Sequence, residues 1–486
     1  MISGTNPVVA GTRPGRYHSR CHLRGLAHIS TAVAILWGAL AFGAVYPWAF
    51  WPLALLAQVA GLAGLFAAAP NDIRYAASRP AAFSRGFVTA LLCVVTAALL
   101  QLLPLPLNIL SAVNPNGVEL LRQWDLAFAA NSRAHSLSMV PSASRFALAL
   151  LGSFIMLLLG TSRVVSLTGP RRLVEMLTAF GVVLALVGII QKPLYARQIY
   201  GFWTPREGGL PFGPFVNKNH FAGWMLMVLP LSLGYLCGAI ARGMRHVGPA
   251  WRQRVLWLST PDANKLILTA AAIGIMGLAL VLTFSRSGIG ALAVSFLMTG
   301  WFAVRRLQGR SRKVIVTAYL LLLPLVLVGW VGTAALVSRF EEHDWASLNG
   351  RRGASADALD TFGRHWLTGT GLNTYQFANR FYQKHDMAAY TSAAHNDYLQ
   401  LAAEGGLLLA IPAAICIALF MSDVRRRLRE DQGSSAYWIR AGAVTALVAI
   451  GLQETVEFSL QIPGNAALFA VVCGIALHTT PERRPR

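Results

Sequence analysis

Residues 391–406, TSAAHNDYLQLAAEGG, place a histidine where a long polar segment meets an apolar one. His395, Asn396 and Asp397 close the polar segment, and Tyr398 begins a long apolar run. Because histidine has a pKa near neutrality, His395 can take a proton from a hydroxyl, with Asn396 or Asp397 to orient its ring. A base at a membrane surface suits a substrate that has one end in lipid and the other in water.

Arg286 is a second candidate, at a tight reversal between two apolar blocks in the sequence LTFSRSGIGALA. Its neighbours are small, so a ligand or another helix can come close. A guanidinium also offers a planar fork of donors that suits phosphate. An arginine at a membrane surface can equally extend to lipid headgroups. The sequence leaves both interpretations open.

Arg351 and Arg352 lie in a nearly neutral segment, residues 338–397, just ahead of a short helix that we expect over residues 355–366. A basic pair at a helix N-terminus opposes the helix dipole, and an anionic ligand would relieve that cost. A solvated pair without a ligand is the alternative. The glycines of residues 369–371 predict a tight turn after the helix.

Further polar residues begin the sixth apolar block. In FGPFVNKNHFAGWM these are Asn217, Lys218, Asn219 and His220. Amides and a lysine suit a sugar or a phosphate, whereas Asn217 or Asn219 can equally cap the helix. Arg206 lies in the loop just before them. Glu404, inside the tenth block, is either the partner of a catalytic group or a structural partner for an arginine, and we favour the structural role.

The composition predicts an all-α polytopic membrane protein. Of its residues 55% are hydrophobic and 13% are charged, and the mean hydropathy is +0.51; soluble domains carry about 25% charged residues. The apolar residues form blocks near the roughly 20 residues that cross a bilayer. We expect twelve of them, at 29–47, 51–69, 86–104, 145–161, 173–191, 219–241, 266–284, 287–304, 314–337, 398–421, 440–456 and 465–479.

The basic residues cluster before the first block and in alternate connections, the pattern of the positive-inside rule. It predicts that both termini are cytoplasmic and that the long segment 338–397 lies in the periplasm of a bacterial inner membrane. The positive-inside pattern accounts for the net charge of +22. We therefore do not expect nucleic acid as a partner. The expected regions are a basic tail at 1–28, spans one to nine at 29–337, a large loop containing short helices at 338–397, spans ten to twelve at 398–480 and a tail at 481–486.

These motifs together resemble the superfamily of O-antigen ligases, O-antigen polymerases and bacterial O-oligosaccharyltransferases. The resemblance covers roughly residues 192–477 and is strongest in AHNDYLQLAAEGGL, with support from FVNKNHFAG and FSRSGIGALA. It implies an inverting, metal-independent transferase without a cofactor. Such an enzyme moves a glycan from undecaprenyl diphosphate to an acceptor hydroxyl at the periplasmic face.

The same resemblance implies that His395 activates the reaction and that Arg286 and Arg352 bind the diphosphate. Arg351 is the alternative to Arg352, because the register is uncertain by one residue. The implied partners are membrane lipid, the lipid-linked donor and an acceptor, which we first expect to be lipid A-core. A repeat-unit polymerase or a protein O-oligosaccharyltransferase remains open. A flippase or transporter is disfavoured, because transporters place ionisable residues near the bilayer midplane.

Overall fold

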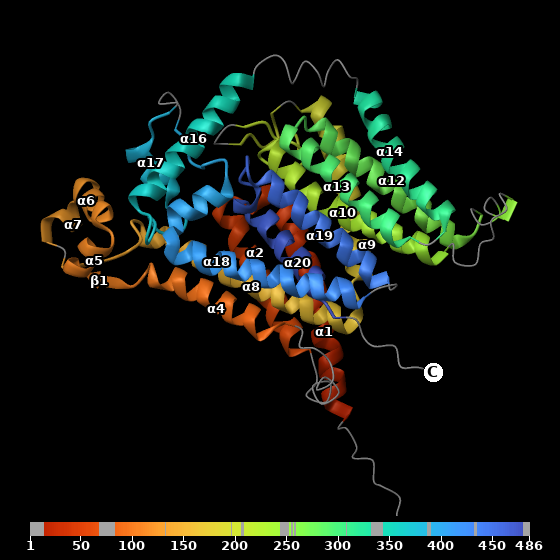
Figure 1. The fold of residues 1–486 in the computed structure, drawn as a ribbon, viewed down its shortest axis with the longest axis horizontal. Coiled ribbons are helices and arrows are strands. Elements are labelled where there is room, and N and C mark those ends of the chain that lie inside the picture. The colour runs from red at the N-terminus through yellow and green to blue at the C-terminus, as the bar shows by residue number, and fades with distance from the viewer. Residues whose placement is uncertain are drawn as a thin grey trace, which may run out of the picture.

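The computed structural model describes residues 14–67, 83–131, 133–195, 197–205, 209–243, 252–253, 256, 259–307, 309–331, 344–385, 390–431 and 435–479. The described residues lie mostly in α-helices, which confirms the predicted all-α class (Figure 1). Within these ranges the one sheet pairs two short antiparallel strands, β1 (Pro104–Pro106) and β2 (Ala134–Ser136).

Each predicted apolar block overlaps one long helix. In chain order these are α1 (Pro14–Leu40), α2 (Pro47–Phe66), α4 (Arg85–Leu100), α8 (Pro141–Thr168), α9 (Arg171–Leu194), α10 (Lys218–Gly243), α12 (Pro261–Leu282), α13 (Arg286–Arg306), α14 (Arg310–Val331), α18 (Asp397–Glu430), α19 (Ser435–Gln453) and α20 (Pro463–Leu477). Among the described residues, nine helices are long and apolar enough to cross a membrane, while α4 and α20 are apolar but shorter. The ends of two predicted blocks, residues 68–69 and 332–337, lie outside the described residues.

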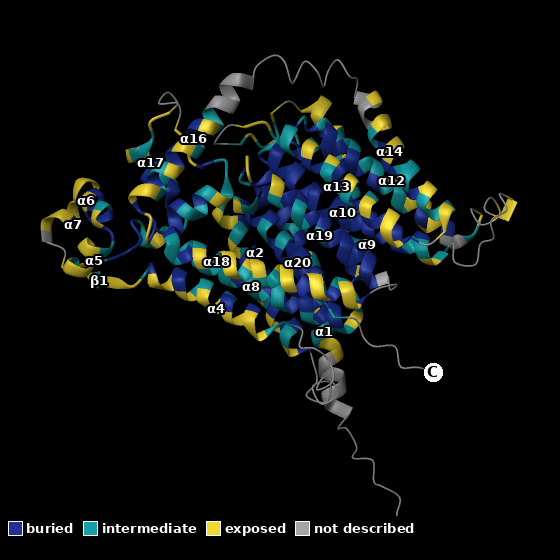
Figure 2. Ribbon diagram, viewed as in Figure 1, coloured by how far each residue is buried: buried dark blue, intermediate teal, exposed yellow. Residues whose placement is uncertain are grey.

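The centre of the bundle is α10, whose apolar segment is 89% buried. A helix that is apolar on all sides belongs inside a bundle, and Figure 2 shows α10 almost wholly in the colour of buried residues. It packs closely against α19 through glycines. A Cβ on Gly234 would lie 2.4 Å from the Trp438 carbonyl oxygen, and one on Gly442 would lie 2.5 Å from that of Pro230. Small residues at such contacts let helices approach closely in a membrane.

Helix α18 is interrupted at Gly406, where φ is +55° and ψ is −165°. The polar segment before the helix folds back onto this break. Leu407 N–H donates to the Trp366 carbonyl at 2.7 Å, and Thr370 N–H donates to the Ala403 carbonyl at 3.1 Å. A Cβ on Gly406 would lie 2.6 Å from the backbone of Leu367. The loop is therefore joined to α18 by backbone contacts that need glycine.

In its described residues, the large loop contains two helices, α16 (Asp344–Arg364) and α17 (Tyr375–Tyr382), which pack together (Figure 1). The predicted start of the first helix, at residue 355, is wrong. Helix α16 begins at Asp344, before Arg351 and Arg352. Arg351 and Arg352 lie within it, so the helix dipole gives no argument for an anion there. Gly353 lets the segment after α17 pack closely against this helix, since a Cβ there would lie 2.6 Å from His385 Cβ.

An earlier connection packs against the large loop. It contains α5 (Leu107–Val113), α6 (Pro115–Trp124), α7 (Leu126–Asn131) and the two strands. Gln101, at the end of α4, donates from Nε2 to the carbonyls of Thr368 at 2.9 Å and Glu404 at 2.8 Å. His365 Nδ1 lies 2.9 Å from Asn114 Oδ1. These bonds hold the two loops and the break in α18 as one body.

Candidate functional site

His395 lies directly before α18, with φ at 49°, in the left-handed region. Residues with a Cβ rarely adopt this conformation, so the surroundings must impose it. Asn396 caps α18 and donates from Nδ2 to the Thr455 carbonyl at 3.0 Å, while Ala394 N–H donates to Gln400 Oε1 at 3.0 Å. Asn396 thus fixes the backbone on one side of His395. No hydrogen bond joins the Asn396 side chain to the His395 ring in the described part of the chain.

The His395 ring is oriented by an aromatic side chain. Phe458 lies with its ring centroid 5.0 Å from that of His395 and at 76° to it. The Phe458 ring also contacts His220, with a distance of 4.8 Å between the ring centroids and an angle of 74° between the ring planes. Edge-to-face contacts of this kind favour one ring orientation. Phe458 therefore brings together two histidines from distant motifs.

Arg351 reaches the same place from α16. Its guanidinium lies 2.9 Å from Glu457 Oε1, and Asn219 Nδ2 donates to this oxygen at 2.7 Å. Glu457 is 1% exposed, whereas the Arg351 side chain is 32% exposed. Arg352 is exposed. Adjacent residues on a helix point about 100° apart, so Arg351 and Arg352 do not face the same neighbours. Of the two predicted arginines, Arg351 is the one beside the cluster.

The turn that carries Arg286 adjoins this group. Helix α13 begins at Arg286, and Ser285 caps it by accepting the Gly288 N–H at 3.3 Å. Lys218 Nζ donates to the Phe284 carbonyl at 3.5 Å, which joins the start of α10 to the turn. Arg286, Lys218, Asn219, His220, Arg351 and His395 thus come from four separate segments into one region.

The His395 ring lies in surroundings that disfavour its charged form. Burial and, to a lesser extent, the positive charge of Arg351 together lower the pKa of His395 to about 4. Both effects disfavour the protonated imidazolium. At neutral pH the ring is therefore uncharged and able to accept a proton.

A pair of carboxyl groups lies beside the start of α18. Asp397 N–H donates to the Glu454 carbonyl at 3.0 Å, and the two side chains share a hydrogen bond. Gln461 Nε2 donates to Asp397 Oδ1 at 2.7 Å. Burial raises the pKa of Glu454, and the adjacent Asp397 carboxylate raises it further. A shared proton explains how the buried Glu454 and the half-buried Asp397 can lie so close.

The remaining predicted residues have other positions. Asn217 acts as a cap at the start of α10, where its Oδ1 accepts the Asn219 N–H at 2.9 Å. Arg206 lies outside the described residues. Glu404 is buried and accepts the N–H groups of Asn373 at 2.7 Å and Tyr375 at 3.0 Å. Its partners are these backbone amides and the Gln400 side chain rather than an arginine, so Glu404 has a structural position.

We expect Glu404→Leu to release the large loop. The substitution leaves two buried backbone donors without an acceptor, each at a cost of about 1–3 kcal/mol. Thermal unfolding should move to lower temperature, and protease should cut residues 365–385 more readily. Glu404→Gln is the matched control, because its amide oxygen can still accept one of the N–H groups. Equal protection of the loop in Glu404→Leu and wild type would contradict this role.

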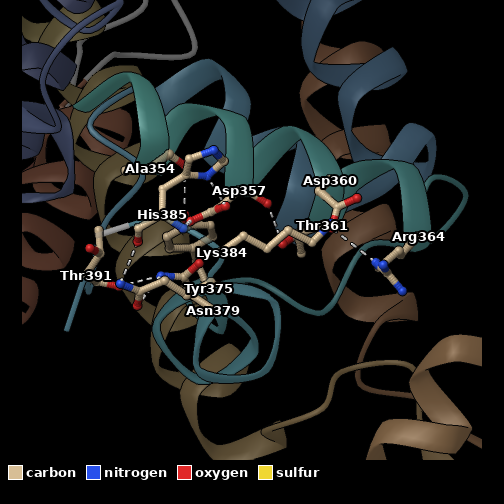
Figure 3. A network of polar contacts seen from close by, with 11 residues as sticks. Ala354, Asp357, Asp360, Thr361, Arg364, Tyr375, Asn379, Lys384, His385 and Thr391 are labelled. Carbon is tan, nitrogen blue, oxygen red and sulfur yellow. Dashed lines mark hydrogen bonds and ion pairs between the residues drawn. The ribbon is translucent and has the colours of Figure 1, made fainter. Parts of the chain in front are cut away.

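A further polar network supports the chain on another face of α16 (Figure 3). His385 Nδ1 lies 2.7 Å from Asp357 Oδ1, and Lys384 forms an ion pair with Asp360 at 3.0 Å. Asn379 Nδ2 donates to the Thr391 carbonyl at 2.9 Å. These contacts hold Lys384 and His385 against α16, and Thr391 against α17.

Sequence reasoning missed Phe458 and the roles of Glu454 and Glu457. The available signal was the presence of two acids in an apolar C-terminal region, where charge is costly and usually has a purpose. Within the described ranges, histidine, cysteine, aspartate and glutamate side chains form no group of three that could hold a metal ion.

Part of the chain is similar to a known family. Residues 271–413 match the family model described as O-antigen ligase. The match includes Arg286, Arg351 and His395 and ends before Phe458 and Glu457. No curated protein matches the chain.

Proposed function

We propose that the chain is a glycosyltransferase that uses a lipid-diphosphate-linked glycan, and the match of residues 271–413 to the O-antigen ligase family supports this proposal. The observation that carries the proposal is the meeting of His395 with Arg351, beside the turn of Arg286. A neutral base and two guanidinium groups are the parts required to activate a hydroxyl and to bind a diphosphate.

In the proposed reaction, the donor diphosphate lies against Arg351 and Arg286. His395 takes the proton of the acceptor hydroxyl as its oxygen forms a bond with the anomeric carbon of the glycan. The bond from that carbon to the diphosphate breaks, and its electron pair leaves with the diphosphate oxygen. Attack from the face opposite the leaving group inverts the anomeric centre. The arginines stabilise the charge that develops on the diphosphate.

The donor fits a membrane location. We propose undecaprenyl diphosphate as its carrier, in a bacterial inner membrane, with the large loop in the periplasm and both termini in the cytoplasm. The apolar segment of α18 is only 17% buried, so the helix that follows His395 faces lipid along most of its surface. A polyprenyl chain can lie there while its headgroup meets the loop. We propose lipid A-core as the first acceptor to test.

The lowered pKa of His395 predicts an unusual pH dependence. The active base is the neutral form, which is populated above the pKa of about 4. The kcat/KM for the donor should therefore stay level down to about pH 5 and fall only as the pH approaches 4, because this parameter follows the free enzyme. Arg351→Gln should move the fall to higher pH by removing the positive charge. A fall centred at pH 6.5 in the wild type would contradict this environment.

The proposed function is tested by glycan transfer with purified protein. A synthetic lipid-diphosphate glycan is supplied with lipid A-core, a single-repeat glycan or a serine-containing peptide, with and without EDTA. A covalent product with one acceptor identifies a ligase, a polymerase or an O-oligosaccharyltransferase, respectively. Movement of labelled donor across liposomes without any covalent product would overturn the proposal in favour of transport.

A further inference from the structure

Glu457 is an acid enclosed within the candidate site. It lies in the connection between α19 and α20 and is 1% exposed. It is outside the family match at residues 271–413. Removing a carboxylate from water is costly unless charged or polar partners replace the water.

The partners of Glu457 come from separate parts of the chain. Arg351 belongs to α16 in the large loop, and Asn219 belongs to the first turn of α10. Ser287, in the first turn of α13, also bonds to this side chain. Burial raises the pKa of Glu457, and the positive charges of Arg351 and Lys218 oppose that rise. Glu457 therefore joins the loop helix to two helices of the membrane bundle. Each joined segment carries one of the predicted ligand-binding motifs.

The contact uses only part of the guanidinium. An arginine has five N–H donors arranged in a plane, and the ion pair with Glu457 is made through Nη2. The other edge of the fork is left to meet a second anion, and the Arg351 side chain is partly exposed. Arg351 also does not need to leave Glu457 when a diphosphate arrives, and leaving would strand a buried charge.

We propose that Glu457 is the positioning residue for Arg351, which holds the guanidinium so that its open edge binds the diphosphate of the donor. This inference rests on the proposed function. Glu457 acts through Arg351 and does not touch the donor. Without it, the large loop can still fold, but the arginine is no longer fixed in direction.

A double-mutant cycle tests the inference, with the KM for a synthetic lipid-diphosphate glycan as the readout. Glu457→Gln keeps the size and polarity of the side chain, and we expect the donor KM to rise about tenfold, with a smaller change in kcat. In the Arg351→Gln background, the same substitution should have almost no further effect, because coupled residues are not additive. In the Arg352→Gln background, it should raise the KM by the full factor again.

Two outcomes overturn the inference. One is a tenfold effect of Glu457→Gln that persists in the Arg351→Gln background, and the other is an unchanged KM. If Glu457→Gln does not accumulate in membranes, Glu457→Asp takes its place in the cycle. It keeps the charge, shortens the reach and should show the same loss of additivity. A wild-type protein that transfers no glycan would instead overturn the proposed function, so the two failures are distinguishable.

Discussion

His395→Asn is expected to abolish glycan transfer while leaving the protein folded in the membrane. Asparagine removes the base, yet it tolerates the left-handed backbone conformation that His395 adopts, with φ at 49°. General base catalysis typically contributes a factor of about 10²–10⁴. We therefore expect kcat to fall by at least about 10² in the synthetic donor assay, with the donor KM little changed.

His385→Asn is the matched control for this substitution. His385 lies in the same loop, but its ring bonds to Asp357 at 2.7 Å and has no contact with Phe458. An asparagine amide can still donate to that carboxylate, so both folding and transfer should persist. Transfer by His395→Asn at the wild-type rate would remove His395 from the mechanism. Equal losses in both variants would point to damage of the loop instead.

Arg351→Gln is expected to weaken the use of the donor about 100-fold in kcat/KM. A hydrogen bond to a charged group contributes about 1.5–3 kcal/mol, which is a factor of roughly 10–150. Arg286→Gln should cause a loss of similar size, because its turn adjoins the same cluster. Both substitutions should weaken binding of the donor diphosphate only. The KM for the acceptor should therefore change little.

Arg352→Gln provides the comparison, since it removes the same charge one residue away. Arg352 is exposed, and it is Arg351 that forms the ion pair with Glu457. We expect its kcat/KM to stay within about threefold of wild type, as for a surface charge acting through solvent. A larger loss in Arg352→Gln than in Arg351→Gln would reverse our assignment of the diphosphate ligand.

Features that depend on neighbouring residues could be predicted from the sequence. Each apolar block overlaps a helix, because the length and hydropathy of a segment suffice to identify it. The reversal at Arg286 was also predictable, since polar and small residues separate two apolar blocks there. The cap at Asn217 was one of the stated alternatives, and it depends only on the first turn of its own helix.

Features that depend on distant contacts could not be predicted. The choice between Arg351 and Arg352 depends on which face of α16 meets Glu457, a residue more than one hundred positions later. The start of α16 was missed, and the local sequence does not show that Gly353 lies inside this helix and makes room for His385. Phe458 has no ionisable or polar group that would mark it in the sequence. Only the fold reveals that its ring contacts two histidines.

The break in α18 has a consequence for how such a protein can diversify. The loop meets α18 through backbone atoms of residues 366–371 and 403–408, where Gly369 and Gly406 leave no room for a Cβ. The segment that carries the proposed base is thus held by main-chain contacts that depend little on the side chains around them. Outer surfaces of the loop are then open to substitution for a new acceptor without displacing that segment.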